Sequence, residues 1–143
     1  MSVDSIIDLS DEDGNEWVEV RASSVLPGEL GVFAKKYIPA GKVIGKYKGI
    51  KMTLEQFQTR YEDKGIWNGY GFYTGHHVID AGPTGNMGNW ACRINAATNT
   101  GKVKNVAITS NANVKAVKNI TAGTELLTAY GKQYWAAYNR MHS

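Results

Sequence analysis

Glycines interrupt the apolar segments of this sequence at short intervals, and this spacing limits the elements that the chain can form. Of its 143 residues, 16 are glycine. Within residues 24–49, Gly28, Gly31, Gly41 and Gly49 separate apolar runs of only a few residues. Short runs between turn residues are typical of β-strands, because a helix needs a longer periodic segment. A mostly β fold with few short helices is therefore predicted.

The rest of the chain continues this pattern around one clear internal helix. Residues 17–21 alternate as a strand, residues 69–82 predict a hairpin, and residues 105–131 predict two or three further strands. In residues 53–61, Thr53 and Gln56 have the spacing of a capping box, which predicts the start of a helix. One face of this helix is apolar, and the C-terminal residues form a second, aromatic-rich helix. The apolar face consists of Leu54, Phe57 and Tyr61.

Charge divides the chain into an acidic leader, residues 1–15, and a basic domain, residues 16–143. Seven acidic residues precede the first basic residue, Arg21. From Arg21 onward there are 16 Lys and Arg against 6 Asp and Glu, a balance of 16 − 6 = +10. This segregation predicts two surfaces with different partners, and the basic surface can contact nucleic acid. Solvated lysines alone are the alternative explanation.

Several classes of protein are excluded by what the sequence lacks. Every apolar run is short, which predicts no transmembrane segment, no signal peptide and a soluble intracellular protein without a membrane partner. Cys92 is the single cysteine, so the chain cannot form an internal disulfide or a cysteine-based zinc site. No metal site is expected.

The leader contains an aliphatic and acidic segment that resembles a SUMO-interacting motif. Ile6, Ile7, Asp8 and Leu9 are followed by a serine and further acidic residues. Such a segment binds by β-augmentation: its apolar residues add a strand to a sheet edge, and its acids meet a basic rim. SUMO is therefore a predicted partner, and a disordered solubilising tail is the alternative.

Four stretches, taken in order and spacing, resemble the SET-type protein methyltransferase family. Residues 31–49 are similar to its opening strands, and VIDAG (78–82) to its IDA strand. GNWACRINAA (88–97) falls without a gap on the Asn-His-Ser segment, and ITAGTELLTAYG (120–131) on the segment that ends in Tyr-Gly. The combination of Asn-Trp with ELL and Tyr-Gly is closer to PR domains, a divergent SET subgroup. The resemblance covers about Trp17 to Trp135 and implies a fold of small curved sheets.

The resemblance implies S-adenosylmethionine as cofactor and places its binding residues in two loops. Asn95 matches the asparagine that hydrogen-bonds the cofactor, and Ala96 occupies the next position, where the family makes its contact mainly through the backbone. Gly31 matches the second glycine of a Gly-x-Gly turn, with Leu30 before it and Glu29 in place of the first glycine.

The resemblance also implies a lysine channel with aromatic walls. Tyr130 matches the catalytic tyrosine and is also a candidate cofactor-binding residue, and Tyr47 and Tyr70 match positions that line the channel. Phe72 and Trp135 are further candidates for its wall, with core packing as the alternative for Trp135. A lid over the substrate would come from the C-terminal helix, from a partner chain or from sequence outside this chain. Methyl transfer to an amine needs alignment and exclusion of water rather than a metal, and aromatic side chains suit this task.

The implied function is an S-adenosylmethionine-dependent protein-lysine N-methyltransferase. By family resemblance, the substrate is a histone or another basic chromatin-associated protein, and the compartment is the nucleus. The alternative is a PR-like module with weak or lost catalysis that serves as an interaction platform. Several positions depart from the family pattern and favour that alternative: Glu29, Ala96, Ala97 and Ala129.

Overall fold

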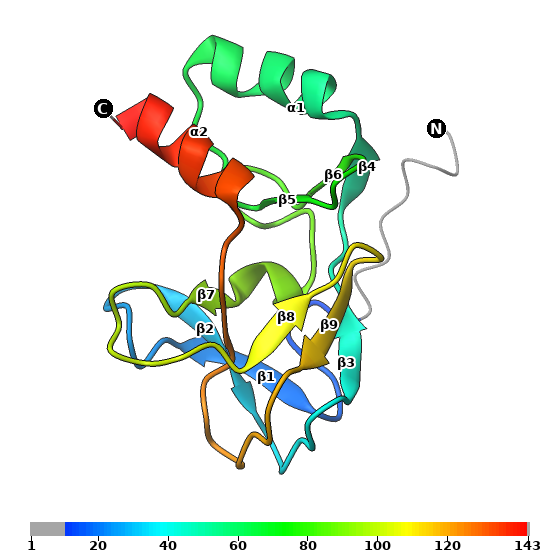
Figure 1. The fold of residues 1–143 in the computed structure, drawn as a ribbon, viewed down its shortest axis with the longest axis vertical. Coiled ribbons are helices and arrows are strands. Elements are labelled where there is room, and N and C mark those ends of the chain that lie inside the picture. Colours follow the sequence, from blue (N-terminus) through cyan, green and yellow to red (C-terminus); the bar gives the residue numbers. More distant parts are fainter. Residues whose placement is uncertain (1–10, 143) are drawn as a thin grey trace.

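The computed structural model describes residues 11–142 and is built mostly from short strands, as predicted (Figure 1). In chain order, the strands are β1 (Val18–Ala22), β2 (Leu30–Ala34), β3 (Val43–Lys46), β4 (Ile50–Met52), β5 (Gly71–Tyr73), β6 (Val78–Asp80), β7 (Asn95–Ala96), β8 (Val106–Ile108), β9 (Asn113–Ala116) and β10 (Leu127–Thr128). The helices are α1 (Leu54–Arg60), α2 (Lys132–His142) and two 3-10 helices, η2 (Glu62–Lys64) and η3 (Trp90–Arg93).

The strands pair into small separate sheets. The pairs β1–β2, β3–β9–β8 and β4–β6–β5 are antiparallel, whereas β7 and β10 pair in parallel. The predicted hairpin is present, with β5 and β6 joined through a turn at Thr74–His77. In Figure 1, β4–β6 lie together with α1 and α2 in the upper part of the molecule, and β1–β3 with β7–β9 lie in the lower part.

The main core lies around Trp90, which is completely buried. Its indole packs against β3 at Gly45, where an added Cβ would lie only 2.6 Å from the Trp90 Cζ2 atom. The pairing of β3 with β9 also shifts register between Val43 and Gly45. A glycine at this position therefore lets the strand pass directly over the indole ring.

A second, smaller core lies under α1. Thr53 caps this helix through both halves of a capping box: its hydroxyl accepts a hydrogen bond from the Gln56 amide, and the Gln56 side chain accepts one from the Thr53 amide. Phe57 and Tyr61 are buried, and Leu54 packs against them. The helix, its cap and its apolar face are thus confirmed.

Residues 11–15, which the sequence assigned to the acidic leader, contact the core of the domain. The Asp11 carboxylate accepts hydrogen bonds from Trp90 Nε1 and Asn89 Nδ2, both at 3.2 Å, and Lys48 Nζ lies 3.0 Å from it. Asn15 donates to the Ile44 carbonyl at 3.0 Å. Residues 11–15 therefore brace the main core. The predicted SUMO-interacting residues 6–9 lie outside the described residues.

We expect this brace to contribute measurably to stability. The double substitution Asp11→Ala and Asn15→Ala removes the acceptor of the Trp90 indole and the donor to Ile44, and should lower the free energy of unfolding by about 2–4 kcal/mol. Urea denaturation gives this value. Glu12→Ala with Asp13→Ala is the matched control, since both residues are exposed. Equal effects of the two pairs would contradict a specific role for the brace.

No helix within residues 11–142 is long and apolar enough to cross a membrane. The longest, α2, has 11 residues.

Candidate functional site

Tyr130 lies in the short segment between β10 and α2. Its hydroxyl donates a hydrogen bond to the Ile94 carbonyl at 3.0 Å. Burial and the neighbouring Tyr134 and Tyr70 raise the pKa of Tyr130 well above its ordinary value. The phenol therefore stays protonated near neutral pH, where it can orient a polar ligand without adding charge.

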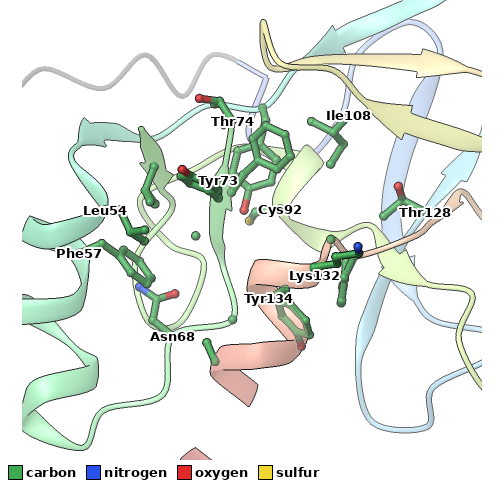
Figure 2. A pocket seen from close by; sticks show the side chains of 18 of the residues that line it. Leu54, Phe57, Asn68, Tyr73, Thr74, Cys92, Ile108, Thr128, Lys132 and Tyr134 are labelled. Carbon is green, nitrogen blue, oxygen red and sulfur yellow. The ribbon is translucent and has the colours of Figure 1, made fainter. Parts of the chain in front are cut away.

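A cavity of about 470 Å³ opens beside Tyr130 (Figure 2). Figure 2 shows Leu54 and Phe57 on one side of it, with Lys132 and Tyr134 on the side of α2. Aromatic and aliphatic side chains form most of the wall. They include Tyr47, Leu54, Phe57, Trp67, Phe72, Tyr73, Val78, Ile94, Ile108, Tyr130 and Tyr134.

The structure brings three of the predicted channel residues together on this cavity. Tyr47, Phe72 and Tyr130 line it, and the rings of Tyr47 and Phe72 lie 5.5 Å apart. Tyr47 is buried, which raises the pKa of its phenol, and its hydroxyl donates to the Tyr70 carbonyl at 2.7 Å. This hydrogen bond fixes the Tyr47 ring as part of the wall.

Two other predicted channel residues contact the lining side chains without being lining residues themselves. Tyr70 contributes its carbonyl to Tyr47, while its ring lies 5.3 Å from the Arg93 guanidinium. Trp135 packs its ring 6.0 Å from that of Tyr130 and is not a lining residue. Both residues therefore support the lining side chains. The residues that flank Tyr70, Gly69 and Gly71, do line the cavity.

Helix α2 covers part of the cavity, as expected for the C-terminal segment. Lys132, Tyr134 and Ala137 line the cavity from this helix. An ion pair of 2.9 Å between Arg140 and Glu62 ties the end of α2 to η2. Trp67 reinforces this contact, because its ring lies 5.4 Å from that of Tyr134. The position of the cover is thus set by contacts with the segment that follows α1.

Sequence reasoning missed two polar lining residues, Asn68 from a loop and Cys92 from η3. Asn68 is buried and bridges two groups: its amide donates to Asp80 at 2.9 Å and its oxygen accepts from the Tyr70 amide. Cys92 also lines the cavity, from η3. Neither residue type suggests an apolar channel. The one available signal for Cys92 is its place within the resembling segment 88–97.

Cys92 should be unreactive in the folded protein. Burial raises the pKa of Cys92 to about 11, so at pH 8 only about one thiol in a thousand is ionised. We expect iodoacetamide to alkylate native Cys92 far more slowly than the unfolded chain at pH 8, with a rate that increases toward pH 11. Intact-mass spectrometry measures the rate with and without urea. Equally fast alkylation in both states would contradict the buried position.

Four of the predicted cofactor residues lie on two strands: Leu30 and Gly31 on β2, Asn95 and Ala96 on β7. Asn95 Nδ2 donates to the Leu30 carbonyl at 2.9 Å and to Glu125 Oε2 at 3.1 Å. A Cβ at Gly31 would overlap the Glu125 carboxylate, so glycine is required there. Glu29 and Leu30 are exposed, whereas Ala96 is buried and pairs with Thr128. Among residues 11–142, no side chain or backbone group donates to Asn95 Oδ1, which leaves an acceptor for a ligand.

The chain segment around Ile94 joins the cavity and the candidate cofactor loop. The carbonyl of Ile94 accepts the Tyr130 hydroxyl, and the next residue is Asn95. The cavity and the candidate cofactor loop are therefore adjacent, and one short segment contributes to both.

In residues 11–142, no group of three His, Cys, Asp or Glu side chains is placed to hold a metal ion.

Comparison with known proteins identifies related domains. The family model of the PR domain of PR domain zinc finger protein 2 matches residues 18–141. The chain is also similar to the methyltransferase domain of human PR domain-containing protein 2, with 30% identity and a TM-score of 0.58. That match covers 82% of this chain and 78% of the human domain. Comparison with curated proteins gives no match.

Two more distant structures share the fold. The Polycomb Repressive Complex 2 of Chaetomium thermophilum has 23% identity and a TM-score of 0.66, over 83% of this chain and 16% of that chain. An inhibitor-bound humanized mutant of the same complex has 24% identity and a TM-score of 0.63, over 82% and 15%. At this identity the likeness concerns the fold alone.

Proposed function

Because this chain belongs to the PR-domain branch of the SET-type methyltransferase domains, we propose that it is an S-adenosylmethionine-dependent protein-lysine N-methyltransferase. The observation that carries the proposal is the position of Tyr130. Its protonated phenol lies at an apolar cavity and contacts the carbonyl of Ile94, one residue before the candidate cofactor ligand Asn95.

The cavity suits the deprotonation of a lysine amine. A free lysine has a pKa of ~10.4, so its neutral form at pH 7.4 costs about 4 kcal/mol. The aromatic wall of Tyr47, Phe72 and Tyr130 removes water from the amine, and desolvation lowers the pKa of a buried lysine. The Tyr130 hydroxyl holds the amine in line for the transfer, which lowers the entropic part of the barrier.

The residues at the cofactor loop fit S-adenosylmethionine. Both amide hydrogens of Asn95 are used within the chain, so its oxygen is the atom that it offers to the ammonium group of the cofactor. Exposed Glu29 and Leu30 offer backbone and apolar surface beside it. When bound, the cofactor supplies an electrophilic methyl group on a positively charged sulfur. Tyr130 and the cavity wall orient the amine and exclude water.

The charge around the cavity bears on the substrate. Its charged lining side chains within the described residues are Glu62 and Lys132, and Glu62 is paired with Arg140. A single lysine with its aliphatic stem matches this nearly neutral channel. A histone or another basic chromatin-associated protein is the proposed substrate, and the nucleus the proposed compartment. The basic surface of the domain would then contact DNA or RNA beside the substrate.

Isothermal titration calorimetry with S-adenosylmethionine tests the cofactor. We expect saturable micromolar binding to the parent, and Asn95→Ala should weaken it by about 1–3 kcal/mol, since a hydrogen-bond partner of the cofactor is lost. Asn111→Ala is the matched control, because Asn111 is exposed in the turn between β8 and β9. No binding to the parent would instead favour the interaction-platform alternative. Equal binding by Asn95→Ala would make residues 89–97 a structural turn only.

The acidic leader supports a second partner, SUMO. We expect Ile7→Ala with Leu9→Ala to abolish SUMO binding without changing the melting temperature, because the motif supplies the apolar residues of an added strand. Fluorescence anisotropy with labelled SUMO measures the affinity. Ser2→Ala with Ser5→Ala is a control in the same segment. Unchanged affinity in the aliphatic double variant would reject the motif.

A further inference from the structure

Glu125 is a buried acid that the proposed reaction does not use. It precedes β10 and bridges to Phe33 of β2, and its exposed fraction is 5%. An ionised carboxylate in such a position is costly unless several donors satisfy it. The donors around Glu125 therefore explain how a carboxylate is stabilised at this buried position.

Hydrogen bonds to Glu125 come from two segments that are distant in sequence. The amide and hydroxyl of Ser24 lie 2.8 and 2.7 Å from Oε1, and the Ser23 hydroxyl lies 2.9 Å from Oε2. Asn95 Nδ2 lies 3.1 Å from Oε2. Burial raises the pKa of Glu125, but the hydrogen bonds from Ser24, Asn95 and Ser23 outweigh it and hold the pKa below its usual range. The carboxylate is therefore charged at neutral pH.

This network settles the orientation of the Asn95 amide. Its nitrogen faces two acceptors, Glu125 Oε2 and the Leu30 carbonyl. A flipped amide would place its oxygen against both acceptors, which is unfavourable. The same carboxylate holds the start of the loop that leads to Gly31, through Ser23 and Ser24. One side chain thus fixes both candidate cofactor segments.

We propose that Glu125 is a positioning residue for the cofactor: it holds the Asn95 amide so that the carboxamide oxygen alone faces the ligand, and so selects ligands with an amino-acid end. The inference rests on the proposed function. Glu125 itself touches neither cofactor nor substrate; it acts through Asn95 and the loop from Ser23 to Gly31.

The binding of two cofactor-related compounds distinguishes a positioning role of Glu125 from a general contribution to the fold. S-adenosylhomocysteine carries the amino-acid end, whereas 5′-methylthioadenosine lacks it. Glu125→Gln keeps the size of the side chain but places an amide donor against the donors of Ser24 and Asn95. We expect it to weaken S-adenosylhomocysteine binding roughly tenfold and 5′-methylthioadenosine binding less than about threefold. The milder Ser24→Ala should give an intermediate loss and covers the case in which Glu125→Gln fails to fold.

A double-mutant cycle tests the route through Asn95. Because Glu125 acts through Asn95 as well as through the loop from Ser23 to Gly31, Glu125→Gln should weaken S-adenosylhomocysteine binding clearly less in the Asn95→Ala background than in the parent. Asp11→Asn is the control, because it perturbs another side-chain network, at Trp90 and Asn89, and should keep the parent preference between the two compounds. Calorimetry gives the affinities and a thermal melt reports folding.

The outcomes distinguish the positioning role of Glu125 from the proposed methyltransferase function. Equal losses for both compounds, or additive losses in the cycle, would overturn the positioning role while leaving the proposed methyltransferase intact. A folded parent that binds neither compound would overturn both.

Discussion

Replacing Tyr130 with phenylalanine should lower methyl-transfer turnover by about 100-fold or more while leaving cofactor affinity nearly unchanged. The substitution keeps the aromatic wall of the cavity and removes the hydroxyl that would align the amine. It also removes the hydrogen bond to the Ile94 carbonyl, which is 3.0 Å long in the parent. We expect a loss of about 1 kcal/mol in stability from that bond. The large effect on turnover therefore has to come from the transition state.

The control removes the hydroxyl group of a tyrosine that lies outside the cavity. Tyr37 is 52% exposed and lies outside the cavity, so Tyr37→Phe should leave turnover at the parent value. Steady-state assays with tritiated cofactor give turnover and Michaelis constants for the parent and both variants. Parent-level turnover in Tyr130→Phe would remove the hydroxyl from the proposed mechanism.

Truncation of Trp90 should have the largest effect on stability, a loss of about 3–5 kcal/mol in the free energy of unfolding. Its side chain is completely buried, packs against Gly45 and donates from Nε1 to Asp11 at 3.2 Å. Trp90→Ala leaves a large cavity under β3 and removes one of the donors to the Asp11 carboxylate. A loss of this size is a large share of the 5–15 kcal/mol typical of a domain.

Trp17 offers a tryptophan for comparison. It is partly buried, and Lys36 Nζ lies 4.3 Å from its ring centroid. Because part of its surface already meets solvent, Trp17→Ala should cost less, about 1–2 kcal/mol. Urea denaturation of both variants, followed by circular dichroism, measures the two losses. Equal losses would contradict the central position of Trp90 in the core.

Local signals in the sequence predicted the elements better than their arrangement. The cap at Thr53 and the hairpin of β5 and β6 depend on residues close together in the chain, so short patterns predict them. The pairing of β3 with β9 and the parallel pairing of β7 with β10 join distant segments. The hydrophobic periodicity of a strand indicates which of its residues are buried, but it does not indicate the strand with which it pairs. These pairings could therefore not be predicted.

At the candidate site too, the sequence predicted individual residues better than their arrangement. Resemblance to the family placed Tyr47, Phe72 and Tyr130 among the channel residues, and these line the cavity. It did not distinguish the lining residues from neighbours that contact them, Tyr70 and Trp135. The contact of Ser24 with Glu125 spans 101 residues, and an acid beside a glycine turn ordinarily suggests an exposed position. Its burial depends on donors that only the folded chain assembles.

The most direct test of the central claim is methyl transfer by the parent protein. The purified chain is incubated with methyl-labelled S-adenosylmethionine and core histones, with nuclear proteins as a second substrate pool, and the products are sequenced by mass spectrometry. We predict labelled methyl groups on lysine side chains, present with the parent and strongly reduced with Tyr130→Phe. A folded, cofactor-binding parent that labels no lysine in either pool would contradict the assignment as a protein-lysine methyltransferase.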